Sequence, residues 1–208
     1  MGKEEHREML FWTKEEYLKF ADVMMDKPVS YYAFEILYWC GLRMGELLAL
    51  TPADFNFETH TLRINKSYQR LHREDVITPP KTLKSNRTIK MPQFLCDEMQ
   101  DYLKMLYEPK EDERIFTISK SYLHHEMNRG SKVSGVKRIR VHDLRHSHVS
   151  LLINMGFTVL AIADRMGHES IDITYRYAHL FPSEQTQMAE QLDIERLSLI
   201  HISEPTRH

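Results

Sequence analysis

The chain has 208 residues, 42% of them hydrophobic and 28% charged, which suits one large domain or two small ones and is not the composition of a disordered chain. Its net charge of −2 gives no overall preference for nucleic acid. Its two cysteines, Cys40 and Cys96, form no C-x-x-C pair. This argues against a disulfide scaffold, a zinc ribbon and a thioredoxin-like redox site, and it indicates a reducing intracellular compartment.

Local signals predict two helices near the start of the chain. Thr13 and Glu16 have the spacing of a capping box, so a helix should run from there to about Met25. A second helix should begin near Pro28, because proline favours the first helical turn. It should end at Gly41, because glycine commonly closes a helix.

The most apolar window of the chain, residues 31–50, carries three charged residues. Charges are costly inside a bilayer, so the window predicts buried helix and no membrane span. It includes a third expected helix over Met44–Leu50. No N-terminal run has the apolar core of a signal peptide.

Three short strands are expected next. Residues 61–68 alternate between apolar and polar side chains, and Val76–Thr78 and Arg87–Lys90 also fit strands. Two prolines, Pro79 and Pro80, exclude a helix between the last two. We expect these strands to form one small three-stranded antiparallel meander.

After Pro92 the hydrophobic pattern returns to a helical period. The remaining helices are expected over Phe94–Leu106, Ser121–Arg129, Asp143–Met155, Thr158–Arg165, Ser170–Tyr177 and Ser183–Leu192. The predicted fold class is therefore α+β: one mainly helical domain with a small three-stranded antiparallel sheet.

We divide the chain into a short leader, residues 1–12, the domain, residues 13–195, and a non-native tail, residues 197–208. The tail resembles the translation of a transposase adapter used in preparing DNA sequencing libraries, and it joins abruptly to a helix that has no stop signal. We exclude it from the fold as an artefact. On this interpretation the natural C-terminus is missing.

The positive charges gather in two tracts, residues 61–90 and 129–148, while the remainder of the chain is acidic. Such segregation suits a protein that presents one face to phosphates. Two solvated basic loops are the alternative, and composition alone does not decide between them. The candidate DNA contacts are Lys66, Arg70, Lys84, Arg87 and Arg140.

A helix beginning near residue 142 would bring His142, Arg145 and His146 to one face. A zinc interpretation treats the two histidines as ligands of an H-E-x-x-H motif, but Asp143 stands in the Glu position and is one methylene too short for that base. A surface helix rich in histidine is a second interpretation. Arg145 favours anion binding, because a guanidinium repels a metal cation and suits a phosphate.

Five separated motifs together resemble the catalytic domain of the tyrosine recombinases, or phage integrases, although each is weak alone. They are Gly41-Leu-Arg43-x-x-Glu46-Leu, Lys81-Thr followed by Arg87-Thr-Ile, His142-x-Leu-Arg145-His-Ser-His, Gly167-His168 and Tyr177-x-His179. They occur in the order and spacing of the family and extend from about Trp12 to Leu192. The strings around Lys81 and His142 look more like integrases of phages and integrative elements than like chromosome-dimer resolvases.

The resemblance implies DNA breaking and rejoining without a metal or other cofactor, with these catalytic residues: Arg43, Lys81, His142, Arg145, His168 and Tyr177. Cutting a phosphodiester needs a nucleophile, charge neutralisation and a proton for the departing oxygen. The planar forks of Arg43 and Arg145 suit a pentacovalent phosphorane. Tyr177 suits the nucleophile of a 3′-phosphotyrosyl intermediate.

The nucleophile and the leaving oxygen each need a partner for proton transfer. An ordinary phenol, with a pKa of about 10, is mostly protonated at neutral pH, so we expect His142 or His168 to accept its proton or hydrogen bond. By the resemblance, Lys81 protonates the leaving 5′-oxygen, although Lys84 lies close enough in sequence to be confused with it. Glu46 is expected to brace the arginines, with a purely local Arg43–Glu46 pair as the alternative.

The implied partner is double-stranded DNA carrying recombination sites, with a tetramer on DNA for the full-length enzyme and no membrane. The implied location is the cytoplasm of a bacterium or phage-infected host, in association with the nucleoid. Members of the family usually carry an N-terminal domain that completes a clamp around DNA, and here about ten residues precede the first helix. We therefore interpret the chain as a monomeric fragment that binds DNA weakly and in a strongly salt-dependent way.

Three other functions stay open at this point. A type IB topoisomerase uses the same kinds of groups, but the length and the integrase-like motifs disfavour it. A catalytically inactive DNA-binding remnant would retain the motifs. A metal-dependent hydrolase would be sensitive to EDTA.

Overall fold

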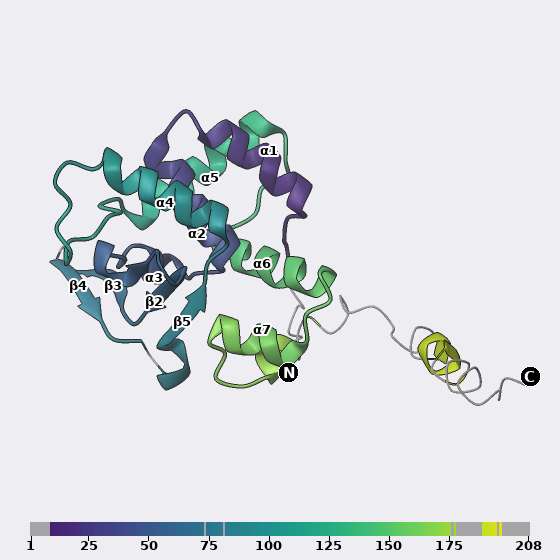
Figure 1. Ribbon diagram of the computed structural model, residues 1–208. Helices are drawn as coiled ribbons and strands as arrows, with labels where there is room; N and C mark the ends of the chain where they lie inside the picture. Colours follow the sequence, from purple (N-terminus) through teal and green to yellow (C-terminus); the bar gives the residue numbers. More distant parts are fainter. Residues whose placement is uncertain are drawn as a thin grey trace, which may run out of the picture.

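Helices form most of the structure, a computed structural model that describes residues 9–72, 74–80, 82–175, 177, 189–194 and 196. The helices are α1 (Lys14–Met24), α2 (Pro28–Cys40), α3 (Met44–Leu47), α4 (Gln93–Met105), α5 (Lys120–Ser134), α6 (Asp143–Asn154), α7 (Val159–Met166) and α8 (Asp172–Tyr175) (Figure 1). The strands are β1 (Phe55–Asn56), β2 (Thr61–Ile64), β3 (Ser67–Leu71), β4 (Glu74–Thr78) and β5 (Arg87–Lys90). This confirms the mainly helical α+β class.

The predicted start of α1 and the predicted end of α2 are confirmed. The Thr13 hydroxyl accepts a hydrogen bond from the Glu16 amide at 3.3 Å, and the Thr13 amide donates to Glu16 Oε2 at 2.9 Å. Pro28 begins α2, and Gly41 ends it with φ +64°. That left-handed conformation turns the chain sharply, and a side chain at position 41 would collide with the ring of His148.

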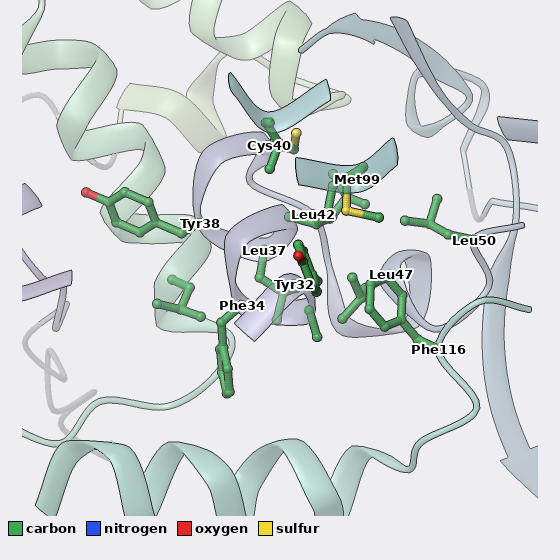
Figure 2. Close-up of a cluster of buried hydrophobic side chains, with 14 of the residues drawn as sticks. Tyr32, Phe34, Leu37, Tyr38, Cys40, Leu42, Leu47, Leu50, Met99 and Phe116 are labelled. Carbon is green, nitrogen blue, oxygen red and sulfur yellow. The ribbon is translucent and has the colours of Figure 1, made fainter. Parts of the chain in front are cut away.

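The core surrounds α2, which packs against α1, α4 and α6. Nine of its thirteen residues are buried. Figure 2 shows one buried cluster in which this helix, with Tyr32 and Leu37, meets Leu47, Met99 and Phe116 from three other parts of the chain. The end of α2, where the first site residues begin, is thereby fixed by the main core.

The expected three-stranded meander is wrong in its membership. The three-stranded sheet has the order β1-β2-β5, with Leu62 of β2 opposite both Phe55 and Ile89. The segment predicted as one strand over residues 61–68 is divided at Asn65 and Lys66. Its second part, β3, forms a separate antiparallel hairpin with β4, so Val76–Thr78 pairs there and not in the main sheet.

The later helices differ from expectation mainly in length. α5 continues past Arg129 to Ser134, where Gly135 closes it in the left-handed conformation, and α8 covers only four residues. The expected helix Ser183–Leu192 lies partly outside the described residues, which are helical over 189–194. The proposed tail, residues 197–208, lies wholly outside them.

A second, smaller core forms where α6 and α7 meet Tyr177, two residues beyond the end of α8. Its members are Val149, Ile153, Ile162, Met166 and Tyr177. Figure 1 shows α6 and α7 beside each other, at the opposite side of the domain from the β3–β4 hairpin. Among the helices of the described residues, none is both long enough and apolar enough to cross a membrane.

Candidate active site

Arg43 lies directly after the turn that ends α2 and caps the N-terminus of α3. Its amide donates to Glu46 Oε2 at 2.9 Å, and its Nη1 donates to Glu46 Oε1 at 2.8 Å. The Arg43 side chain is still 40% exposed. The guanidinium is thus held from one side and open to solvent on the other.

Glu46 is the centre of a buried charge network. Besides Arg43, it accepts hydrogen bonds from Nη1 and Nη2 of Arg87, each at 3.1 Å. Burial alone would raise the pKa of Glu46, but the hydrogen bonds and charge of Arg87, together with the charge of Arg145, lower it to about 2. Glu46 is therefore ionised, as expected of a brace between cationic side chains.

The structure corrects the expectation that Arg87 faces DNA. Its side chain is only 6% exposed, and Nε donates to the Arg165 carbonyl oxygen at 3.0 Å. Nη1 also donates to the Ser85 carbonyl oxygen at 3.1 Å. The guanidinium therefore joins β5 to Glu46 and to the end of α7 from inside the protein.

Arg145 is buried on α6 and is held by main-chain oxygens. Nη1 donates to the Gly41 carbonyl oxygen at 2.6 Å, and Nη2 donates to the carbonyl oxygen of Met166. Burial and the charge of Arg43 lower the pKa of Arg145 to about 9, which leaves the side chain charged at neutral pH. Arg145 thus ties the ends of α2 and α7 to α6.

His168 follows the glycine that closes α7. Gly167 has φ +61°, and a Cβ there would lie 2.6 Å from the Lys84 carbonyl oxygen, so only glycine fits this close approach. His168 is buried, and its Nδ1 forms a hydrogen bond with Thr174 Oγ1 at 2.8 Å. Burial and the charges of Arg145, Arg43 and Arg87 lower the pKa of His168 to about 4.

Tyr177 reaches back to α6. Its hydroxyl forms a hydrogen bond with Nδ1 of His146, and the residue is 4% exposed. His142 stands at the N-cap of α6, where its ring lies edge-on to the ring of His146 with centroids 5.3 Å apart. Burial and the charge of Arg145 lower the pKa of His142, although the residue retains an exposed surface.

The hydrogen-bond partner of Tyr177 was not identified from the sequence. We expected His142 or His168, whereas the structure places His146 on the tyrosine hydroxyl. The helical spacing brought His146 to the same face as His142 and Arg145, but that spacing gives no distance to Tyr177. Which of the three histidines contacts the tyrosine hydroxyl depends on where the fold places residue 177.

A cleft of about 290 Å³ opens beside Arg43. It is lined by Arg43 and Glu46, by Thr78 at the end of β4 and Pro80 beyond it, and by Gly167. Lys81, the residue after Pro80, lies outside the described residues. The partly exposed side chain of Arg43 lines this cleft.

The other predicted DNA contacts differ in their exposure and in their ion pairs. Lys66 is half-buried and donates to Asp54 Oδ2 at 2.6 Å. Arg140 pairs with Asp143 at 2.7 Å. Lys84 and Arg70 are exposed, with Arg70 Nε lying 3.8 Å from Asp75. Lys84 and Arg70 thus lie on the surface, as phosphate contacts would.

The zinc interpretation of His142 and His146 finds no third ligand among the described residues. Within the described ranges, no three or more His, Cys, Asp or Glu side chains are grouped so that they could hold a metal ion. His146 uses Nδ1 on Tyr177, and its Nε2 faces Asp143 at 3.8 Å.

The known sequences that this chain resembles include integrases. Residues 11–184 match the phage integrase family. The chain is similar to the ICEBs1 integrase of Bacillus subtilis (strain 168), with 31% identity over 202 residues that cover 90% of this chain and 55% of the relative. It is also similar to a putative prophage phiRv2 integrase of Mycobacterium tuberculosis (strain CDC 1551 / Oshkosh), with 27% identity covering 79% and 46%. The chain therefore spans about half the length of these relatives.

Solved structures show the same fold. The Tn1549 transposon integrase in complex with a circular intermediate DNA superimposes with a TM-score of 0.77 at 20% identity, covering 91% of this chain and 68% of that one. The catalytic domain of bacteriophage HP1 integrase gives a TM-score of 0.62 at 20% identity, covering 88% and 95%.

Proposed function

The chain belongs to the phage integrase family, and we propose that it is the catalytic part of a site-specific DNA recombinase that cuts and rejoins strands through a 3′-phosphotyrosyl intermediate. The observation that carries this proposal is the convergence of Arg43, Arg145, His168, His146 and Tyr177 from four separate parts of the chain.

The arginines supply charge neutralisation. Arg43 presents a partly open guanidinium beside the cleft, and Arg145 carries a buried positive charge close enough to lower the pKa of His168. Both forks are fixed by protein hydrogen bonds before any ligand arrives. Preorganised donors of this kind favour a transition state in which negative charge builds on phosphate oxygens.

Tyr177 is the proposed nucleophile. Its hydroxyl attacks the scissile phosphorus, the Tyr177 Oη–P bond forms and the P–O5′ bond breaks. The product is an ester of a phenol, which is an activated ester, so a DNA 5′-hydroxyl can attack it later and restore the strand without an external energy source. The reaction is a reversible transesterification.

The departing 5′-oxygen needs a proton, and Lys81 is its proposed donor. The support is the sequence motif together with the position of Pro80, the preceding residue, at the cleft. General acids contribute about 10²- to 10⁴-fold to such steps. Glu46 and Arg87 have a positioning role, because they contact Arg43 and Arg165 and lie inside the protein.

The proposed partner is double-stranded DNA carrying a recombination site, bound by a tetramer of the longer enzyme. The exposed cations Arg70 and Lys84 are proposed phosphate contacts. A domain that makes few phosphate contacts should bind DNA weakly, and its affinity should fall as salt rises with a slope set by the number of those contacts.

The test is covalent capture of DNA. The protein is incubated in EDTA with a pool of nicked duplexes whose flanking sequence is randomised, so that the recombination site need not be known, and adducts are separated by denaturing electrophoresis. We expect an adduct with the wild-type protein and none with Tyr177→Phe, whose melting temperature should change little. Absence of an adduct even at low salt would favour an inactive DNA-binding remnant.

A further inference from the structure

The partner of the Tyr177 hydroxyl suggests how the nucleophile loses its proton. We propose that His146 is the general base that takes the proton from Tyr177, and that Asp143 orients the imidazole for this task. This assignment rests on the proposed function. It gives the role to a different histidine from the two that the sequence motifs suggested.

The imidazole of His146 lies between the carboxylate of Asp143 and the phenol of Tyr177. His146 Nδ1 is in hydrogen-bond contact with the Tyr177 hydroxyl, and Nε2 on the opposite edge of the ring lies 3.8 Å from Asp143 Oδ1. The carboxylate favours the tautomer that carries its proton on Nε2. Nδ1 is then free to accept from the phenol, which is the arrangement that a base needs.

Asp143 is itself firmly held. It is fully buried in the first turn of α6, and it accepts a hydrogen bond from the Arg140 amide at 2.8 Å and another from Arg140 Nη2 at 2.7 Å. Asp143 and His146 are three residues apart on one helix, so their side chains share a face. The ring of His146 is therefore oriented by a rigid element and not by a loop.

The other two histidines are placed less well for this step. His168 uses Nδ1 on Thr174 Oγ1, at 2.8 Å. His142 lies at the exposed N-cap of α6, with its ring edge-on to that of His146. Their positions suit contacts with the phosphate more than removal of the phenol proton.

His146 is neutral before DNA binds. Burial and the charges of His142, Arg140 and Arg145 lower its pKa to about 4, against the opposing effect of Asp143. A neutral imidazole can receive a proton, and the negative charge of a bound phosphate would stabilise the imidazolium that results.

In strand cleavage, two proton transfers accompany the exchange of bonds at phosphorus. The Tyr177 Oη–P bond forms as the Tyr177 proton moves to Nδ1 of His146. The P–O5′ bond breaks, and the 5′-oxygen takes a proton from the ammonium group of Lys81. In the rejoining step the imidazolium returns its proton to the departing phenolate.

The test compares two substitutions that separate proton transfer from positioning. His146→Asn retains an acceptor oxygen near the place of Nδ1 but cannot take the proton, whereas His146→Ala removes both functions. His125→Asn on α5, which replaces an exposed histidine, is the matched control. Single-turnover adduct formation is measured on a duplex captured by the wild-type protein, and DNA affinity and melting temperature are measured for every variant.

We expect both His146 variants to react about 10²-fold more slowly than wild type at pH 6.5, with His125→Asn unchanged. For His146→Asn the rate should rise about tenfold per pH unit up to pH 9, because the ionised fraction of an ordinary phenol rises by that factor. The wild-type rate should stay nearly flat, so the gap should close at high pH. If His146 had only a structural role, His146→Asn would be slower than wild type by the same factor at every pH.

A substrate with sulfur in place of the bridging 5′-oxygen identifies the affected proton, because a thiolate leaves without protonation. With this substrate, Lys81→Ala should regain the wild-type rate of adduct formation, whereas His146→Asn should stay as slow, relative to wild type, as it is with the ordinary substrate. The proposal is overturned if His146→Asn reacts within threefold of wild type at pH 6.5, or if sulfur restores it. An inactive wild-type protein would instead overturn the proposed function itself.

Discussion

Replacing Glu46 by Gln should lower the free energy of unfolding at neutral pH and have progressively less effect in acid. The Glu46 side chain is 7% exposed, and its pKa is about 2, compared with an ordinary 4.5. A carboxyl whose folded pKa is depressed stabilises the fold above its unfolded pKa, and that stability is lost as the pH falls through the folded value. The relevant window therefore runs from pH 4.5 down to pH 2.

The size of the effect follows from the difference between the two pKa values. Each unit is worth about 1.4 kcal/mol, so Glu46 contributes about 3 kcal/mol at pH 7. At pH 3 the unfolded carboxyl is almost fully protonated and the folded one is mostly ionised, which leaves about 1.4 kcal/mol. The neutral value agrees with the roughly 3–5 kcal/mol expected when one partner of a buried ion pair is removed.

The assay is urea unfolding of wild type and Glu46→Gln at pH 7, 5 and 3. The other carboxyl groups are the same in both proteins, so their titration cancels in the difference. Glu58→Gln, in an exposed turn, is the matched control and should stay within about 0.5 kcal/mol of wild type at each pH. A difference for Glu46→Gln that is equal at pH 7 and pH 3 would refute the assignment of this stability to the charge of Glu46.

Three further outcomes test the site and its supports. Gly167→Ala should lower the melting temperature by about 5 °C, because a side chain at φ +61° is strained by about 1–2 kcal/mol and would meet the Lys84 carbonyl; an unchanged value in a thermal scan would contradict this. Lys84→Ala should reduce the salt slope of DNA binding by about 1, measured by fluorescence anisotropy at several salt concentrations, and an unchanged slope would exclude a phosphate contact. Arg145→Lys should slow adduct formation at least about 10²-fold in single-turnover assays, because one ammonium cannot reproduce the fork held by Gly41 and Met166. A near-normal rate would mean that the charge alone suffices.

The helices were easier to predict than the sheets because their signals are local. Thr13 with Glu16, Pro28 and Gly41 each mark a helix boundary within a few residues of sequence. The strand Phe55–Asn56 is too short to show an alternating pattern, so its pairing with β2 left no trace in the sequence. The break at Lys66, whose ammonium turns to Asp54, was equally invisible.

For the site, the sequence motifs named most of the side chains that the fold brings together, but not which of them touch. Glu46 and Arg87 are 41 residues apart, and His146 and Tyr177 are 31 residues apart. No spacing rule covers such distances, because the contacts depend on how α6, α7 and the sheet pack. For the same reason Arg87 looked like a DNA contact when only its charge and its neighbours were considered.

The anchoring of Arg145 has a consequence for how this domain tolerates mutation. Its guanidinium is held by carbonyl oxygens of residues 41 and 166, and every amino acid carries such an oxygen. Replacement of the Met166 side chain can loosen the small core but leaves the carbonyl oxygen that accepts from Arg145. A change in the backbone path at either helix end would remove the hydrogen bond formed there. The position of the buried arginine is thus insulated from drift in neighbouring side chains, and the residues around it are free to diversify.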